Sequence, residues 1–201
     1  MATIDPTQDA KMILRATAKQ VRSDAARLGP VTAAMDIAQF VIEAFDAGHM
    51  TPPAMCVAGY LPLGDEIDPQ PALAAFADRG WTLALPVVLA RDTALEFREW
   101  TPGAPLEDGA LRTRHPAFGA QVVQPGLVLS PMLAFDSEGY RLGWGGGFYD
   151  RTIAERRPTG AVFVGCAYSA QRVDNCPRGP YDMALDAVVT ENGYAKVPFN
   201  P

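Results

Sequence analysis

Apolar residues recur every three or four positions along the first 48 residues of the chain, and this spacing predicts two helices. The first helix is expected to begin after Pro6, with Thr7 as its N-cap, and to end before Gly29. The second helix is expected over 31–48. The residues predicted to be buried are Met12, Ile13, Ala16 and Leu28 in the first helix, and Met35, Ile37, Phe40, Val41 and Phe45 in the second.

After residue 50 the pattern changes to short continuous apolar runs, which are typical of buried strands. Helical spacing returns twice, at 69–80 and 148–157. The Pro- and Gly-rich stretch 101–126 is expected to be an irregular loop that folds over a site. Strands that alternate with helices predict one α/β domain over residues 1–201, with a mostly parallel sheet covered on both faces. The predicted strands cover 54–60, 81–88, 94–100, 126–135, 159–168 and 186–190.

The composition narrows the class of protein. The chain has 201 residues, a net charge of −6 and 48% hydrophobic residues, which suits a single globular domain and disfavours nucleic-acid binding. No apolar run reaches the roughly 18 to 20 residues of a membrane helix, and the N-terminus lacks the apolar core of a secretory signal. We therefore expect a cytoplasmic protein. Its three cysteines form no C-x-x-C pair and are expected to be buried structural thiols.

The stretch RLGWGGGFYDR, residues 141–151, carries the strongest chemical signal. Its glycines have no Cβ, so their N–H groups can turn inward and wrap a phosphate group. The helix predicted after them would aim its first amides at the same anion, and Arg141 would add a charged donor. Asp150 beside a polyanion favours a hard cation such as Mg²⁺. The spacing matches neither the dinucleotide-binding fingerprint nor the P-loop, and a plain glycine turn is the alternative.

Other charged residues are candidates for the same site. Lys11 and Arg15 lie four positions apart, so they share one helix face that suits an anion, or else form a solvated stripe. Glu66 follows a predicted strand and suits the amino groups of a heterocycle, the alternative being a surface acid. Asp182 and Asp186 flank the last strand, and Asp186 is the one expected to join the metal site. The alternative for both is a capping or surface role.

The longer stretch PMLAFDSEGYRLGWGGGFYDR resembles the signature of the 5-formyltetrahydrofolate cyclo-ligases, also called methenyltetrahydrofolate synthetases. Blocks similar to those of the family occur in the same order across nearly the whole chain: KMILR, YLPLGDEID, LALPVV, AYSAQRV and PYDMALDAVVTE. The resemblance implies a three-layer α/β/α sandwich with a mostly parallel sheet, related to sugar-phosphate isomerases and CoA transferases. It also implies ATP and Mg²⁺ as cofactors and 5-formyltetrahydrofolate as the small-molecule substrate. We expect a monomer that contacts neither nucleic acid nor a membrane.

The resemblance also assigns roles to individual residues. It implies that Arg141 and Tyr149 are catalytic and that Asp150 and Asp186 hold the magnesium ion. The ATP-binding residues it implies are Lys11, Arg15, Arg141, Leu142, Gly143, Trp144, Gly145, Gly146, Gly147, Phe148 and Tyr149. The substrate-binding residues it implies are Leu61, Glu66, Trp144, Gly145, Gly146, Gly147 and Phe148.

The chain departs from the family pattern at three positions. Gly146 stands where many members carry Lys, Phe148 replaces Tyr, and Tyr181 stands where His often precedes the aspartate. The first departure leaves the phosphate contacts to Arg141, Lys11 and Arg15. None of the three removes the carboxylates or the other glycines.

The reaction that the resemblance implies uses ATP to phosphorylate the formyl oxygen on N5 of the folate. N10 then attacks and phosphate leaves, giving 5,10-methenyltetrahydrofolate and ADP. This chemistry depends on positioning and charge neutralisation and requires no general base. Two alternatives stay open: an ATP-dependent enzyme of the same scaffold acting on another small acid, and a non-catalytic folate- or nucleotide-binding protein.

Overall fold

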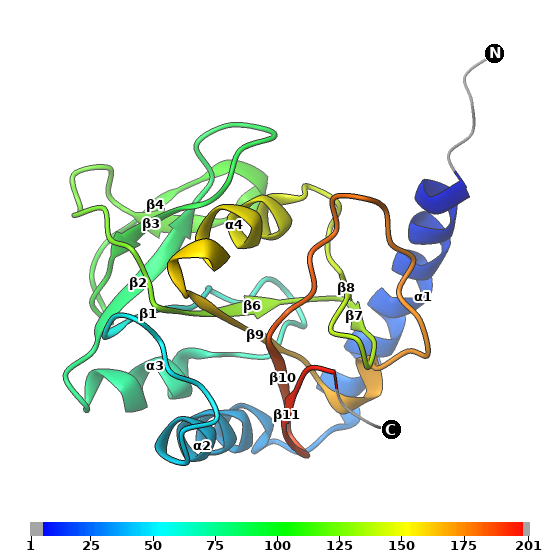
Figure 1. Cartoon of the computed structure of the whole chain (residues 1–201), viewed down its shortest axis with the longest axis horizontal. Helices are drawn as coiled ribbons and strands as arrows, with labels where there is room; N and C mark the ends of the chain where they lie inside the picture. Colours follow the sequence, from blue (N-terminus) through cyan, green and yellow to red (C-terminus); the bar gives the residue numbers. More distant parts are fainter. Residues whose placement is uncertain (1–5, 199–201) are drawn as a thin grey trace.

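A seven-stranded sheet forms the centre of the computed structural model, which describes residues 6–198 (Figure 1). Its strands are β1 (Cys56–Ala58), β2 (Thr82–Val87), β3 (Glu96–Glu99), β6 (Leu127–Pro131), β9 (Val162–Cys166), β10 (Ala187–Thr190) and β11 (Gly193–Lys196). Their order across the sheet is β11-β10-β9-β6-β1-β2-β3. The five inner strands are parallel, and the two edge strands pair antiparallel with their neighbours. The sheet is thus mixed and mostly parallel, as predicted.

Helices cover both faces of this sheet. The helices α2 (Ala33–Asp46) and α3 (Gln70–Ala77) lie below it in Figure 1, and α4 (Phe148–Arg156) lies above it. Side chains that alternate along β1 show the same division, because Val57 packs among residues of α2 and α3, whereas Ala58 packs in the cluster that contains Ile153 of α4. Burial on both faces explains why these strands are continuous apolar runs in the sequence.

The first helix, α1 (Pro6–Leu28), lies beyond the end of β6, beside a short hairpin of β7 (Ala134–Phe135) and β8 (Arg141–Leu142) (Figure 1). It packs there through Ala18, in a small core cluster with the hairpin.

The predicted apolar face of α1 is wrong. Lys11, Ala18 and Arg22 are buried, because the helix turns a mostly polar face towards the loops at the end of the sheet. Thr7 lies inside the first turn rather than at the N-cap, since the helix already begins at Pro6. The apolar residues that are instead between 63% and 70% exposed are Met12, Ile13 and Leu28.

Other local predictions also need correction. Met35 is 61% exposed, and Ile42 with small alanines takes its place on the buried side of α2. The stretch 101–126 contains an antiparallel pair, β4 (Leu106–Asp108) and β5 (Arg114–Pro116), rather than only irregular loop. Strand β11 was not predicted, because its residues are only half-buried at the sheet edge and lack a continuous apolar run. Three short 3-10 turns complete the described chain, at Ala110–Arg112, Arg157–Thr159 and Ser169–Gln171.

The described residues also bear on the cysteines and on the membrane. All three cysteines are buried and free, as predicted. Between residues 6 and 198 no single helix is long and apolar enough to cross a bilayer, although α1 and α2 together, bent by 98°, satisfy that criterion by length and composition. The prediction about a secretory signal falls partly on residues 1–5, which lie outside the described residues.

Candidate active site

The glycine loop, residues 143–147, lies between β8 and the first turn of α4. Its backbone needs glycine at two positions, since φ is +105° at Gly145 and +67° at Gly147, in the region that other residues rarely adopt. Gly147 is also the N-cap of α4, where a Cβ would lie 2.9 Å from Nη1 of Arg151. The loop therefore brings four small residues to the N-terminus of a helix, which is an arrangement suited to an anion.

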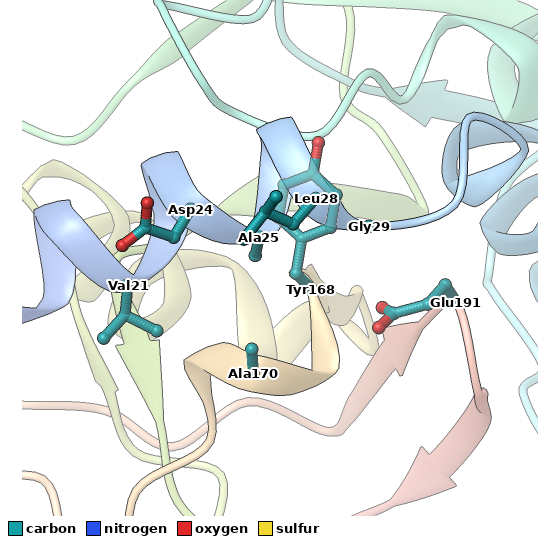
Figure 2. Close-up of a pocket in the computed structure, with 8 residues that line it drawn as sticks. All are labelled: Val21, Asp24, Ala25, Leu28, Gly29, Tyr168, Ala170 and Glu191. Carbon is teal, nitrogen blue, oxygen red and sulfur yellow. The ribbon is translucent and has the colours of Figure 1, made fainter.

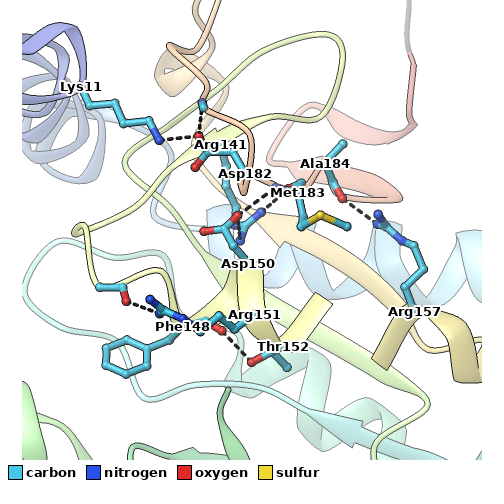
Figure 3. Close-up of polar contacts among 12 residues, drawn as sticks. Lys11, Arg141, Phe148, Asp150, Arg151, Thr152, Arg157, Asp182, Met183 and Ala184 are labelled. Atoms are coloured by element: carbon cyan, nitrogen blue, oxygen red, sulfur yellow. Dashed lines mark hydrogen bonds and ion pairs between the residues drawn. The ribbon is translucent and has the colours of Figure 1, made fainter. Parts of the chain in front are cut away.

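Two cations of α1 reach this loop and the segment that follows β9. Arg15 donates from Nε to the carbonyl oxygen of Gly143 at 3.0 Å. Lys11, which is buried, forms an ion pair through Nζ with Oδ2 of Asp182 (Figure 3). The predicted pair on one helix face thus lies beside the glycine loop, although both side chains already have partners within the protein.

Arg141 connects the loop to the C-terminal segment (Figure 3). Its Nη1 donates to the carbonyl oxygen of Met183 at 2.7 Å, and its Nη2 donates to Oδ1 of Asp150 at 3.0 Å. The backbone N–H of Met183 donates to the same carboxylate oxygen at 3.1 Å. Burial lowers the pKa of the Arg141 guanidinium, and the charge of Asp150 opposes that shift. Arg141 therefore lies beneath the loop with its side chain only 4% exposed.

The two candidate aspartates near the last strand occupy different surroundings. Asp182 belongs to the network of Arg141, whose pKa its charge raises, and it accepts hydrogen bonds from Lys11 and from the N–H of Gly179. Asp186 instead accepts from Arg157 at 3.1 Å and from the N–H of Phe163 at 2.8 Å. Both oxygens of Asp186 are thus engaged in fixing β9 against β10. Asp182 thus shares its surroundings with Lys11 and Arg141, and the metal role expected for Asp186 stays a prediction.

Glu66 is held by contacts with α1, with the glycine loop and with its own segment after β1. Its Oε1 accepts from Nη1 of Arg22 at 3.2 Å and from Nε1 of Trp144 at 3.1 Å, while Oε2 accepts from the N–H of Leu63 at 3.0 Å. The Trp144 ring lies between two cations, with Lys19 Nζ 4.8 Å and Arg22 Cζ 5.3 Å from the ring centroid. Trp144 is itself 53% exposed, whereas Glu66 is buried.

The remaining predicted residues surround these groups. Tyr149, in the first turn of α4, packs against the core, and desolvation together with the negative charge of Glu66 raises its pKa far above the ordinary value. Its phenol is therefore a hydrogen-bond donor at neutral pH and not a base. Phe148 packs its ring against Gly146, Leu142 is buried in the cluster beneath α1, and Leu61 packs on the core at the end of β1.

The two described cavities lie elsewhere. One, of about 410 Å³, is lined by α1 residues together with Tyr168, Ala170 and Glu191 (Figure 2). The other, of about 280 Å³, is lined by residues near β3 and includes Glu155. At the glycine loop the space is occupied by side chains, since Arg15 and Arg151 donate to its carbonyl oxygens and Trp144 folds onto Glu66. A ligand bound at the loop must displace these contacts.

The residues around Arg141 fit a magnesium ion, which proteins commonly hold with one or two carboxylates and substrate phosphates. Among the described residues no group of three or more His, Cys, Asp and Glu side chains is placed to hold a metal. Asp150 and Asp182 each have one carboxylate oxygen that accepts no hydrogen bond from residues 6–198, and their side chains are 23% and 21% exposed. Carboxylate oxygens of this kind, together with phosphate oxygens, are the ligands that Mg²⁺ takes in nucleotide sites.

Comparison with known proteins decides the family. A profile of the 5-formyltetrahydrofolate cyclo-ligase family matches residues 7–191. The chain belongs to this family.

Relatives and solved structures agree with this assignment. The 5-formyltetrahydrofolate cyclo-ligase of Escherichia coli (strain K12) is 34% identical over 142 residues, which cover 68% of this chain and 78% of the relative. The Mycolicibacterium smegmatis protein of the same name is 32% identical over 143 residues, which cover 67% and 72%. The structure of Aquifex aeolicus 5,10-methenyltetrahydrofolate synthetase superposes with a TM-score of 0.71 at 27% identity, covering 95% of this chain and 94% of that one. A Mycoplasma pneumoniae synthetase structure, at 22% identity and a TM-score of 0.70, shows the shared fold.

Sequence reasoning missed two contacts of this cyclo-ligase site, those of Lys19 and Arg22. Their spacing was the available signal, because Lys11, Arg15, Lys19 and Arg22 follow one another at intervals of four, four and three, along one helix face.

Proposed function

We propose that this chain converts 5-formyltetrahydrofolate and ATP to 5,10-methenyltetrahydrofolate, ADP and phosphate at the glycine loop. The ATP-dependent cyclo-ligase activity, which belongs to one-carbon metabolism, is inferred from membership of the family. The observation that supports the location is the convergence of Lys11, Arg15 and Arg141 on one glycine-rich helix N-terminus. Cations beside the N-terminus of a helix are what a transferring phosphoryl group requires.

On the nucleotide side, the loop amides and Arg15 bind the phosphates once Arg15 leaves the Gly143 carbonyl oxygen. Lys11 adds a positive charge beside the loop. Arg141 links Asp150, in the first turn of α4, to the main chain at Met183. Asp150 and Asp182 would hold Mg²⁺, which neutralises phosphate charge when bound. Asp186, the ligand expected from the sequence, instead stabilises the junction of β9 and β10.

On the folate side, Glu66 accepts hydrogen bonds from the pterin, and Leu61, Trp144 and Phe148 provide apolar contact. Tyr149 remains protonated and is placed near Glu66 and Arg141, so it can donate a hydrogen bond to the reacting groups. With both substrates in place, the formyl oxygen takes the terminal phosphoryl group of ATP and ADP leaves. The N10 lone pair then attacks the formyl carbon, the C–O bond to the phosphorylated oxygen breaks, and the departing phosphate carries away the N10 proton.

The decisive experiment follows methenyl absorbance with purified protein, 5-formyltetrahydrofolate and Mg-ATP. We expect turnover that requires both ATP and the folate, with one ADP released per methenyl group formed. Absence of turnover at high enzyme concentration would refute the proposal. ADP release that other small acids stimulate and folate does not would favour another enzyme of this scaffold, and tight binding of both ligands without ADP release would favour a non-catalytic protein.

Several coarser expectations are part of the same proposal. The chain is proposed to act as one catalytic domain over residues 1–201, as a monomer in the cytoplasm. Helices on both faces of the sheet support the proposed three-layer α/β/α sandwich and its relation to sugar-phosphate isomerases and CoA transferases.

A further inference from the structure

We infer that Arg22 binds the pterin ring together with Glu66, by donating a hydrogen bond from its Nε–H to the carbonyl oxygen at position 4 of the ring. This inference rests on the proposed function and deepens it, because it names a determinant of which folates the site accepts. Arg22 lies outside the sequence signature that identifies the family, and no role was expected for it from the sequence.

The first observation is a buried ion pair. Nη1 of Arg22 lies 3.2 Å from Oε1 of Glu66, and the two side chains are only 5% and 4% exposed. Burial of two charges carries a large desolvation cost that a pair alone does not reliably offset. Stability alone does not explain such a pair. Because Glu66 is a predicted ligand of the substrate, we connect its partner Arg22 with substrate binding as well.

The second observation concerns the atom of Arg22 that faces no partner. Its Nε is buried, and no residue of the described chain accepts a hydrogen bond from it. Buried donors are satisfied in the great majority of cases, so an exception beside a binding residue calls for an acceptor that arrives with a ligand. Glu66 accepts a hydrogen bond from Nη1, and of the guanidinium nitrogens of Arg22 it is Nε that is fully buried without an acceptor among the described residues.

The third observation is what now covers this pair. The indole of Trp144 donates Nε1–H to Glu66 at 3.1 Å, and its ring lies over the guanidinium of Arg22. A flat bicyclic ring with an N–H donor is thus already bound at Glu66, in the way that a pterin would bind. Trp144 is 53% exposed and belongs to the glycine loop, so it can give way to a ring of similar shape.

The hydrogen-bonding pattern of the pterin fits the two side chains. One edge of the ring carries N–H donors at the 2-amino group and N3, next to the acceptor oxygen at C4. Glu66 supplies the acceptor and Arg22 Nε supplies the neighbouring donor. A site built from a paired donor and acceptor discriminates strongly against an analogue that reverses one of them.

The test compares Arg22→Lys with Arg27→Lys, a matched change on the same helix at a side chain that is 66% exposed and paired with Asp24. Lysine keeps the charge opposite Glu66 but has no Nε–H. We expect Arg22→Lys to raise KM for 5-formyltetrahydrofolate about tenfold and to leave KM for ATP within about twofold, as expected for one lost hydrogen bond to the folate. Arg27→Lys should change neither. Equal rises in both KM values, or no change in the folate KM, would overturn the inference.

A second measurement needs only the wild-type protein and does not depend on how the variant folds. Calorimetric titration compares 5-formyltetrahydrofolate with its 4-amino-4-deoxy analogue, which places a donor where the carbonyl oxygen stood and also removes the N3–H that faces Glu66. We expect the natural folate to bind at least about tenfold more tightly, and this preference to shrink by about tenfold in Arg22→Lys, where only the contact with Glu66 still distinguishes the two ligands. Equal affinities in the wild type, or a preference of the same size in the variant, would overturn the role of Arg22. Loss of turnover without loss of folate binding would instead count against the proposed function alone.

Discussion

Gly147 illustrates how single residues shape this site. Its left-handed backbone at φ +67° disfavours any residue with a Cβ, and a Cβ there would also displace the end of the Arg151 side chain, whereas a Cβ at Gly143 would meet no atom within 4 Å. The sequence shows four glycines with equal weight, and only the structure separates Gly145 and Gly147, which the backbone requires, from Gly143, which it does not. The same holds for Arg22 and Asp182, because residue type and spacing do not tell in which direction a side chain points.

We predict that Gly147→Ala lowers the free energy of unfolding by about 1–2 kcal/mol, the cost of a left-handed conformation for an alanine. It should also raise KM for ATP, since α4 then starts with a displaced first turn. Gly143→Ala is the control and should leave stability within about 0.5 kcal/mol of the wild type. Urea denaturation of both variants measures the difference, and equal stabilities would contradict the prediction.

The two aspartates near β10 give a second prediction for individual residues. Asp182→Asn should raise KM for Mg-ATP about tenfold, because it removes a carboxylate beside Lys11 and Arg141. Asp186→Asn should leave KM for Mg-ATP unchanged and lower the free energy of unfolding by about 1–2 kcal/mol, because it weakens the bonds to Arg157 and to the N–H of Phe163. Kinetics over a range of magnesium concentrations and urea denaturation test the pair. The opposite assignment of effects would restore Asp186 as the metal ligand.

Among the elements, the inner strands and the bounds of α1 were predictable, whereas the buried face of α1 was not. Strands such as β2 and β6 are buried on both faces, so their apolar runs could be read directly from the sequence. Helix α1 covers a functional site with a polar face, so the period of its apolar residues pointed to the wrong side. Strand β11 and the β4–β5 pair were missed for a related reason, since short edge strands carry too few buried residues to produce a pattern.

Helix α1 also gives a prediction of its own. Arg15→Met should raise KM for ATP about tenfold, because it removes a charge-assisted donor beside Gly143 and Gly145. Stability should change little, since the methionine stem keeps the apolar part of the contact. The control is Arg27→Met near the far end of the same helix, and it should leave KM for ATP unchanged. A similar rise for both variants would show that general charge, rather than this position, attracts the nucleotide.

At the scale of the whole molecule, stability should fall at alkaline pH. Burial raises the pKa of Cys166 to about 12 and, with the charge of Asp136, that of Cys176 to about 12, from an ordinary value of 9.0. Between pH 9 and 12 the unfolded chain loses these protons and the folded protein keeps them, so the unfolded state becomes favoured. Each thiol contributes a slope of about 1.4 kcal/mol per pH unit in that window. Urea denaturation between pH 7 and 11 should show a plateau followed by this decline, and the double variant Cys166→Ser/Cys176→Ser should reduce the slope.

The ion pair of Lys11 and Asp182 joins residues 171 positions apart. During synthesis the lysine leaves the ribosome first, and its carboxylate follows after every strand of the main sheet except β10 and β11. A chain that stops before residue 182 therefore leaves Lys11 without this counter-charge and Arg141 without the carbonyl oxygen of Met183. We expect such a chain to bind a nucleotide poorly, because two of the cations proposed to contact the phosphates lack the partners that position them.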